Sequence, residues 1–422
     1  MKKNFLILGA GTAGTIMANH MRRKLDLTKW QITLLDKDAE HYYQPGFLFM
    51  PFGIYSEEDI VRPKRKFIGR GVTYLQVPVE RIDAGANRVQ LATGDSISYD
   101  VLVVATGTAP APEETEGMTG SDWRDKVHEF YTFEGSRALR GALQEFKGGR
   151  LVVHICEMPI KCPVAPLEFA FLADAWLSEH GLRDKTAITF VTPLSGAFTK
   201  PVASKILGHL LEDKKINVVT DFSIARVDNE DHKIVSWDEK EVPYDLLVTV
   251  PTNMGDPMIE RSGLGDEFNY VPTDKHTLQS KAHKNIFVIG DATDAPTSKA
   301  GSVAHFEAEV LTENLLAFID GKPLETHFDG HANCFIESGK GKGYLLDFNY
   351  EQEPVTGKFP VPGIGPMSLL DESRLNHMGK MAFKWIYWNV LLQGLPIPMV
   401  GHKMSMAGKN IPKEEKVPVA SE

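Results

Sequence analysis

The sequence predicts an α/β fold in which parallel strands alternate with helices, and three observations support this prediction. An apolar run, NFLIL, leads into the glycine-rich GAGTAG and then into a helix-like segment. A second apolar run, QITLLD, follows that helix and ends in an acidic residue. Two later apolar runs, YDVLVVATG and KNIFVIGD, both end in small residues. Strands that end in this way are typical of a doubly wound sheet with a ligand at its carboxyl edge.

Length and composition narrow the class of protein. The 422 residues are enough for two or three domains, and a hydrophobic content of 42% with 24% charged residues is ordinary for a folded chain. The net charge of −10 gives no overall basic surface for nucleic acid. An odd count of three cysteines argues against a disulfide scaffold.

The N-terminus could be mistaken for a secretory signal. Two lysines precede an apolar run, but the run covers only Phe5 to Leu8 before the glycines begin. It is therefore interpreted as a buried strand that enters a turn. This predicts that Met1 is the true start and that the protein is cytoplasmic.

The first glycine motif predicts a dinucleotide site. Gly9, Gly11 and Gly14 have the spacing G-x-G-x-x-G between a strand and a helix. They permit a tight turn, close approach to a pyrophosphate and close helix–strand packing. Asp36 ends the next strand, about 20 residues further on, where a carboxylate accepts a hydrogen bond from a ribose hydroxyl.

Two further strand ends indicate FAD as the dinucleotide. Thr106 and Gly107 end one strand, and Gly290 and Asp291 end the other. Together with the first motif, these segments resemble the flavoprotein disulfide reductase superfamily. The resemblance implies bound FAD, with Asp291 on its ribityl chain and with the sheet completed after an inserted domain. Taken alone, Asp291 is also compatible with a helix N-cap.

The inserted segment, residues 113–275, lacks the motif that NAD(P)H-using members of this superfamily carry. Its first strand is GRLVVHICEMPIKCP, where Pro159, Cys162 and Pro163 stand in place of glycines. Without glycines a pyrophosphate cannot approach the backbone closely. We therefore expect two Rossmann-like, doubly wound, three-layer domains, the second with a degenerate NAD site.

The cysteines carry a closer resemblance. CPVAPLEFAF around Cys162 and ANCFIESG around Cys334 resemble the sulfide:quinone oxidoreductases and the flavoprotein subunit of flavocytochrome c sulfide dehydrogenase, over nearly the whole chain. The resemblance implies that the two cysteines face each other over the isoalloxazine ring and carry a disulfide or polysulfide bridge. Some members have another cysteine near residues 120–135, tied to covalent flavin or to catalysis. This chain has none there, which favours non-covalent FAD.

The implied chemistry suits these residue types. Hydrosulfide attacks a sulfur of the bridge by thiol–disulfide exchange, and sulfur is retained as a persulfide or polysulfide. Glu168 matches a family acid that moves protons, although it is also compatible with an exposed or capping helix carboxylate. His128 is a weaker candidate for the same task. Cys156 follows an apolar strand and is expected to be a core thiol.

Lys299 opens the helix-like segment after Asp291. Its cation could stabilise a reduced flavin anion or hold a quinone oxygen. The alternative is a solvated lysine in the first turn of a helix.

The last hundred residues predict a membrane-facing region. Met381, Trp385, Trp388 and Leu392 fall at helical spacing, with lysines at 380, 384 and 403 nearby. Polar residues and prolines interrupt the run, so it is too short to span a bilayer. Such a helix suits the headgroup region, although an amphipathic helix packed on the core remains open. Candidate walls of an apolar quinone pocket are Phe335, Tyr344, Phe348 and Phe383.

The expected domain organisation has four parts. Residues 1–112 and 276–325 form the FAD domain, residues 113–275 form the insert, and residues 326–422 form a quinone- and membrane-associated region. The expected activity is sulfide oxidation with quinone as acceptor, on the cytoplasmic side of the cell membrane as a peripheral protein. The alternatives are a flavocytochrome-type subunit, a type II NADH:quinone reductase and a non-catalytic flavin sensor. A homo-oligomer is left open.

Overall fold

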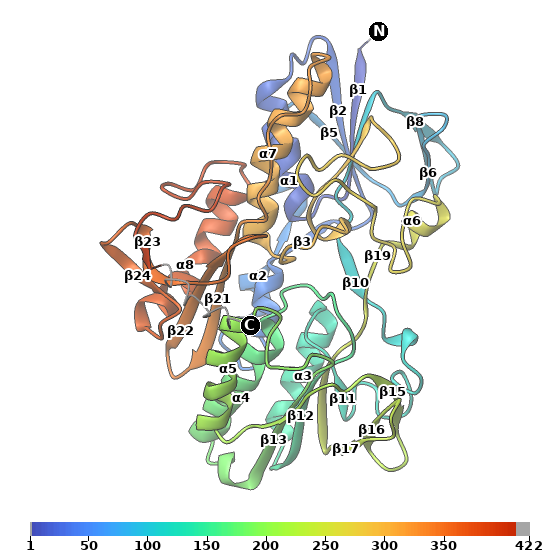
Figure 1. Cartoon of the computed structure of the whole chain (residues 1–422). Coiled ribbons are helices and arrows are strands. Elements are labelled where there is room, and N and C mark those ends of the chain that lie inside the picture. Colours follow the sequence, from blue (N-terminus) through green and yellow to red (C-terminus); the bar gives the residue numbers. More distant parts are fainter. Residues whose placement is uncertain (1, 411–422) are drawn as a thin grey trace, which may run out of the picture.

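A five-stranded parallel sheet carries the N-terminal motif (Figure 1). The computed structural model describes residues 2–410. The strands run in the order β20, β9, β1, β2, β5, with bounds Ile286–Val288, Val101–Val104, Lys3–Leu8, Trp30–Asp36 and Val72–Gln76. The central strands are apolar and buried because both faces of the sheet are covered.

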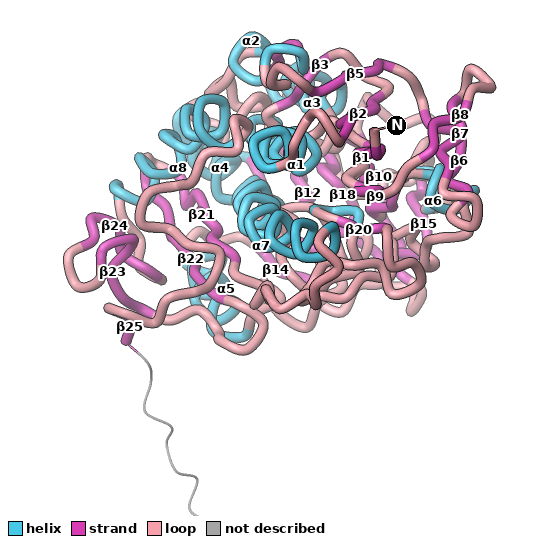
Figure 2. Tube along the Cα trace, turned by 90° about the horizontal axis from the view of Figure 1, so that it is seen from above, coloured by secondary structure: helices cyan, strands magenta, loops and turns pink. Residues whose placement is uncertain are grey.

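Alternate residues of β1 supply two different cores. Phe5 and Ile7 pack under α1 (Thr12–Lys24) and α7 (Gly301–Ile319), which lie side by side in Figures 1 and 2. Leu6 and Leu8 point the other way, into a smaller core. The antiparallel strands β6, β7 and β8 cover this second face, with bounds Val79–Asp83, Arg88–Leu91 and Ser96–Ser98.

A second five-stranded parallel sheet has the same layered build. Its order is β11, β18, β12, β13, β14, with bounds Val127–His128, Leu246–Val250, Gly149–Ile155, Thr186–Val191 and Asn217–Val219. One core contains residues of α3, α4 and α5, which span Phe133–Glu145, Ala165–Glu179 and Pro201–Asp213. The other core lies under β15, β16 and β17, which span Ile224–Asp228, Lys233–Ser236 and Glu241–Pro243.

Two short antiparallel strands join the halves: β10 (Thr108–Pro110) pairs with β19 (Asn253–Gly255). The chain then returns to the first sheet, where β20 lies beside β9. The predicted fold class, α/β with two doubly wound sheets, is confirmed. The predicted domain boundaries stay predictions.

The C-terminal part adds two antiparallel sheets and one helix. β21 (Ala332–Gly339) pairs with β22 (Lys342–Phe348) and packs against α4. The other sheet has the order β24, β23, β25, with bounds Gly365–Leu369, Thr356–Val361 and Lys409–Asn410. Helix α8 (Arg374–Ile386) continues into a π-helical turn at Tyr387–Leu391. Among residues 2–410, no helix has the length and apolar character needed to cross a membrane.

Short elements fill the connections. The strands β3 and β4 span Glu40–Tyr42 and Val61–Pro63, and the helices α2 and α6 span Glu57–Ile60 and Pro257–Arg261. Single 3₁₀ turns lie at Gln44–Leu48, Lys64–Lys66, Pro112–Glu114, Arg183–Lys185 and Gly290–Ala292.

Four residues were predicted to form a membrane-facing side of the C-terminal helix: Met381, Trp385, Trp388 and Leu392. The prediction is wrong for the last two. Trp385 is 65% exposed, but Trp388 is 3% exposed and Leu392 is fully buried. The π-helical turn bonds over five residues, so the α-helical spacing does not continue through it. Trp388 instead stacks on Phe67, with ring centroids 5.1 Å apart.

A buried asparagine ties this C-terminal segment to α1. The Asn19 amide donates to the carbonyls of Phe67 (2.7 Å) and Leu392 (2.8 Å), and its oxygen accepts from the Gly69 N–H (3.1 Å). Asn19→Ala leaves these groups without partners, so we expect a loss of about 2–4 kcal/mol in the free energy of unfolding. Chemical denaturation measures this loss. Asn389→Ala, which removes an exposed amide–carbonyl bond, should change stability by less than ~0.5 kcal/mol.

Candidate functional site

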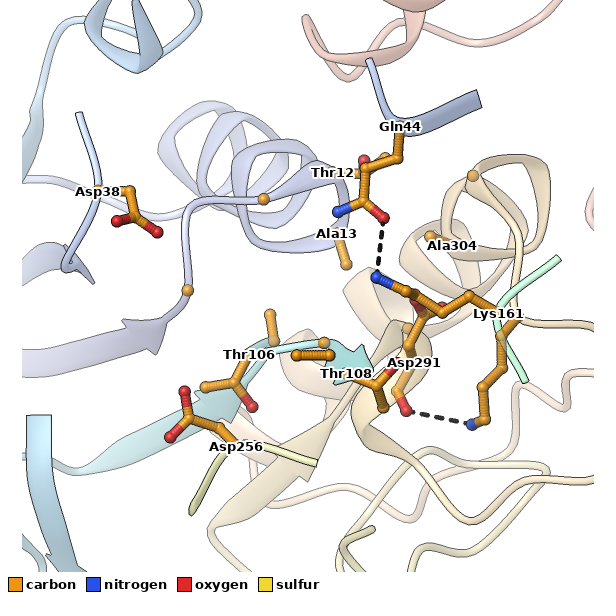
Figure 3. Close-up of a pocket in the computed structure, with 18 of the residues that line it drawn as sticks. Thr12, Ala13, Asp38, Gln44, Thr106, Thr108, Lys161, Asp256, Asp291 and Ala304 are labelled. Carbon is orange, nitrogen blue, oxygen red and sulfur yellow. Dashed lines mark hydrogen bonds between the residues drawn. The ribbon is translucent and has the colours of Figure 1, made fainter. Parts of the chain in front are cut away.

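A cavity of about 700 Å³ opens where β1, β9 and β20 end. The first glycine motif lines it from one side, and Cys162 and Glu168 line it from the second sheet's side. Figure 3 shows Thr12, Thr106 and Asp291 around this space. The carboxyl edge of the first sheet is therefore the candidate site, as the strand ends predicted.

The three motif glycines have different surroundings. A Cβ atom on Gly9, whose φ is +93°, would lie 2.4 Å from the Ala105 carbonyl oxygen. A Cβ atom on Gly14 would lie 1.8 Å from the Gly9 carbonyl oxygen, so this glycine permits helix–strand packing. Gly11 lines the cavity, and a Cβ atom there would meet nothing within 4 Å. Gly11 is thus the point where a ligand can approach the backbone.

Two buried hydroxyls support a bound dinucleotide. The hydroxyls of Thr106 and Thr108 line the cavity and have no hydrogen-bond partner within the described residues. Gly107 lies between them with φ of +69° and open space beside it. Buried polar atoms are almost always satisfied, so these two fit a polar ligand such as the FAD ribityl chain or pyrophosphate. The residues present fit FAD.

Asp36 lines the cavity, but its carboxylate is already bonded within the protein. One oxygen accepts from the Ala10 N–H (2.6 Å), and the other pairs with the Lys64 ammonium (2.6 Å). These bonds hold the glycine turn against the end of β2. A ribose hydroxyl would therefore share the carboxylate with Lys64.

Lys299 lines the cavity, and its predicted action on a flavin or quinone stays a prediction. Its side chain is buried rather than solvated, and its ammonium donates to the carbonyls of Asp291 (3.1 Å) and Thr293 (2.7 Å). The solvated alternative is therefore wrong. The Lys299 cation fixes the turn that presents Asp291 and Gly290 to the cavity, and both of these residues line it.

Several cavity residues escaped the sequence analysis. Lys161 is buried and reaches Gln44, with its ammonium 3.3 Å from the amide oxygen (Figure 3). The Tyr387 hydroxyl lies 2.7 Å from the Thr12 hydroxyl and 2.7 Å from the His41 ring. These residues come from distant parts of the chain and share no motif, so only the fold identifies them.

Cys162 and Cys334 are both tied to the segment that contains Ser298 and Lys299. Cys162 lines the cavity with φ of +44°, and its N–H donates to the Lys299 carbonyl (2.8 Å). The Cys334 sulfur lies 3.7 Å from the neighbouring Ser298 hydroxyl. The structure has both as free thiols. Two cysteines that are far apart in sequence thus each contact one of two adjacent residues.

The two thiols share one electrostatic environment. Burial raises the pKa of the Cys334 thiol to about 11, and the Ser298 hydroxyl works against this rise. Burial also raises the pKa of Cys162 well above its ordinary value. Glu168 adds to both rises, and Lys380 opposes both. Both thiols are consequently neutral at physiological pH.

Glu168 is fully buried and lines the cavity. One carboxylate oxygen accepts from the Lys380 ammonium and from the Glu337 N–H (2.7 Å). Burial raises the pKa of Glu168 to about 7, with Lys380 opposing this rise. The alternative of an exposed or capping carboxylate is wrong.

Lys380, predicted to lie among lipid headgroups, instead lines the cavity, with its side chain only 12% exposed. Burial acts to lower the pKa of the Lys380 ammonium. The negative charges of Glu168 and Glu337 raise this pKa by more than burial lowers it, so the net shift is upward. The nearby Lys384 pairs with Asp59 at 2.6 Å.

The remaining candidates lie outside the cavity. Cys156 is buried in the second sheet's smaller core, 3.5 Å from the Thr249 hydroxyl, as expected for a core thiol. His128 is buried, and its ring lies 3.0 Å from the Asp125 carbonyl. The four aromatic residues predicted to form a quinone pocket do not line this cavity: Phe335, Tyr344, Phe348 and Phe383.

Comparisons with known proteins agree with this geometry. Residues 3–153 match a family described as pyridine nucleotide-disulphide oxidoreductase. The chain is 27% identical over 398 residues to a mitochondrial sulfide:quinone oxidoreductase of Dictyostelium discoideum, covering 92% of this chain and 86% of the relative. It is 22% identical to a Staphylococcus aureus type II NADH:quinone oxidoreductase, covering 85% and 92% of the two chains.

A solved structure shows the same fold. The sulfide:quinone oxidoreductase of Aquifex aeolicus superposes with a TM-score of 0.76 at 22% identity, covering 93% of this chain and 92% of that one. The comparisons confirm the resemblance that the cysteine segments indicated. They also confirm the enzyme class, a flavoprotein oxidoreductase.

The motif glycines provide a matched pair of variants. Gly14→Ala places a Cβ atom against the Gly9 carbonyl, so we expect a large fall in melting temperature. Gly11→Ala meets no protein atom but occupies ligand space. We expect Gly11→Ala to fold, with a melting temperature close to that of the unmodified protein from which flavin has been removed. It should retain less flavin than the unmodified protein. Thermal unfolding and visible flavin absorbance measure the two effects, and equal flavin content in Gly11→Ala and the unmodified protein would contradict the assignment.

Proposed function

We propose that this chain, which resembles sulfide:quinone oxidoreductases over about nine-tenths of its length, oxidises sulfide to polysulfide or sulfur and passes the electrons to quinone. One observation carries the proposal. Two cysteines from distant segments are tied to adjacent residues, Ser298 and Lys299, beside a cavity that fits FAD. A buried acid, Glu168, acts on both thiols.

The cysteines do the sulfur chemistry. In the oxidised protein, Cys162 and Cys334 form a bridge, and hydrosulfide attacks one of its sulfurs. A new sulfur–sulfur bond forms as the bridge bond breaks, which gives a persulfide on one cysteine and a thiolate on the other. FAD, when bound without a covalent link, supplies a two-electron carrier between this pair and quinone. The net change is hydrosulfide plus quinone plus one proton, giving zero-valent sulfur plus quinol.

Two charged side chains, Glu168 and Lys380, assist this exchange. The Lys380 ammonium lowers the free energy of the thiolate that forms when the bridge opens. The Glu168 carboxyl has a pKa near neutrality because it is buried, so it exchanges a proton readily at physiological pH. Its second oxygen is buried and has no partner within the described residues, which leaves it available to a sulfur species.

NADH is the competing electron donor, because the chain also resembles a type II NADH:quinone oxidoreductase. Against this, the strand β12 leads into Pro159 and Cys162 where a nicotinamide site needs glycines. That loop is bonded to the rest of the protein through the Lys161 N–H, which donates to the Asn253 side chain (3.0 Å).

The deciding experiment is anaerobic addition of sulfide to one sample of the purified protein and NADH to another. We expect sulfide alone to bleach the oxidised flavin and a short-chain quinone to restore it. Cys162→Ser and Cys334→Ser should each slow bleaching by roughly 100-fold or more. Cys156→Ser is the matched control, because its hydroxyl can bond Thr249, and it should bleach at the normal rate. Bleaching by NADH instead would overturn the proposal.

An exposed apolar stripe on α8 supports a membrane surface as the place where quinone is met. Leu375, Met378 and Trp385 lie on one face of the helix, and Met378 is 61% exposed. Exposed apolar residues of this size suit insertion among lipid headgroups. We place this face against the cytoplasmic side of the cell membrane as a peripheral contact.

Charged substitutions test this surface. Met378→Glu combined with Trp385→Glu should weaken binding to phosphatidylcholine vesicles by roughly 10-fold or more, because apolar area no longer leaves water. Vesicle co-sedimentation measures the affinity. Trp237→Glu is the matched control: Trp237 is 76% exposed but lies beside β16, far along the chain from α8. Equal losses in both variants would contradict a specific docking face.

A further inference from the structure

Turnover of a buried sulfur site requires a proton to cross the protein. This argument rests on the proposed function. Hydrosulfide brings one proton and quinol carries two, so one proton per turnover comes from solvent. Cys162, Glu168 and Lys380 lie at the cavity, but Glu168 is fully buried. A route from solvent to Glu168 would let this acid regain a proton after it has given one to the cavity.

The first step of such a route is Glu337. Its side chain is buried, and its backbone N–H donates to the Glu168 carboxylate at 2.7 Å. One oxygen of each carboxyl group, Glu168 and Glu337, is buried without a partner within the described residues. Both acids also act on the Lys380 ammonium, which bonds Glu168 directly. Lys380 thus pairs with one buried acid and lies within the electrostatic reach of the other.

The second step is His377. Its ring nitrogen Nδ1 lies 2.8 Å from the second Glu337 oxygen, and its side chain is 29% exposed. His377 precedes Lys380 by three residues on α8, so the two side chains lie on neighbouring positions of one face. An imidazole accepts a proton at one nitrogen and releases one from the other. His377 therefore links solvent to a buried carboxylate.

We propose that His377 and Glu337 form a proton path that joins Glu168 to solvent, while Lys380 stabilises the negative charge of Glu168. A proton enters at the His377 ring and passes to Glu337. The proton passes on to Glu168, whose second carboxyl oxygen, like one oxygen of Glu337, is buried and has no partner within the described residues. Glu168 then gives a proton to a group in the cavity. No group is oxidised or reduced along this path.

The titratable groups around Glu168 come from several elements. They are Lys380 on α8, Glu337 and Cys334 on β21, Cys162 in the loop before α4, and Tyr43 and Tyr131. Only the Glu337 carboxylate is bonded to a partly exposed histidine, His377.

Replacing the histidine tests the path. His377→Ala should lower kcat by roughly 10-fold with little change in KM for sulfide, and free imidazole should restore most of the rate. Glu337→Gln should lower kcat similarly without imidazole rescue. Glu168 must be protonated to give a proton, so kcat should fall as the pH rises through about 7. This fall should disappear in Glu168→Gln. His209→Ala, which removes an exposed histidine that also pairs with a glutamate, should leave kcat unchanged.

A second readout does not depend on activity. The infrared carbonyl band of protonated Glu168, identified by its loss in Glu168→Gln, shifts when its proton exchanges with deuterium. We expect this exchange to be about 10-fold slower in His377→Ala and to recover with imidazole. Unchanged exchange and kcat in an active His377→Ala would overturn the path. Absence of sulfide:quinone turnover in the unmodified protein would instead refute the proposed function, and the exchange rate would still decide the path.

Discussion

The buried ion pair between Glu168 and Lys380 is the interaction on which the site depends. Glu168 lies in the first turn of α4, Lys380 lies on α8, and the Glu337 N–H of β21 bonds the same carboxylate. The pair therefore joins the second sheet's helix to the C-terminal part of the chain. Removing one member of such a pair leaves an unpaired buried charge, at a cost of about 3–5 kcal/mol. The elements that carry Cys162 and Cys334 are held together by this contact.

The same pair sets the chemistry of the thiols. Burial and the Glu168 charge make thiolates unfavourable, so the neutral forms of both sulfurs are the stable ones. The Lys380 charge opposes the rise in both thiol pKa values and so lowers the cost of a thiolate at either sulfur. Because burial keeps the Glu168 pKa near neutrality, protonation of this one acid changes the cost of a neighbouring thiolate. Under the proposed function, this arrangement would couple proton movement to the opening of the bridge.

Sequence patterns predicted the parts of the molecule that depend on local rules. Gly9, Gly11 and the strand ends follow from backbone geometry, and the cysteine segments were identified by resemblance. Lys380 and Tyr387 were missed because their partners, Glu168 and Thr12, lie 212 and 375 residues away. The apolar face of the C-terminal helix was half wrong because a π-helical turn changes the spacing after Ile386. Long-range pairing and local irregularity leave no periodic signal in one sequence.

The contacts of Lys299 join the part of the cavity beside Asp291 to the segments that carry the two cysteines. Its ammonium holds the carbonyls of Asp291 and Thr293, while its own carbonyl accepts from the Cys162 N–H. The adjacent Ser298 hydroxyl contacts Cys334. Two of the three donors of this ammonium are directed to the backbone, and its action on a ligand stays a prediction. Any shift of the Asp291 turn therefore moves one support of Cys162, so the first sheet helps to set the position of a cysteine that belongs to the second.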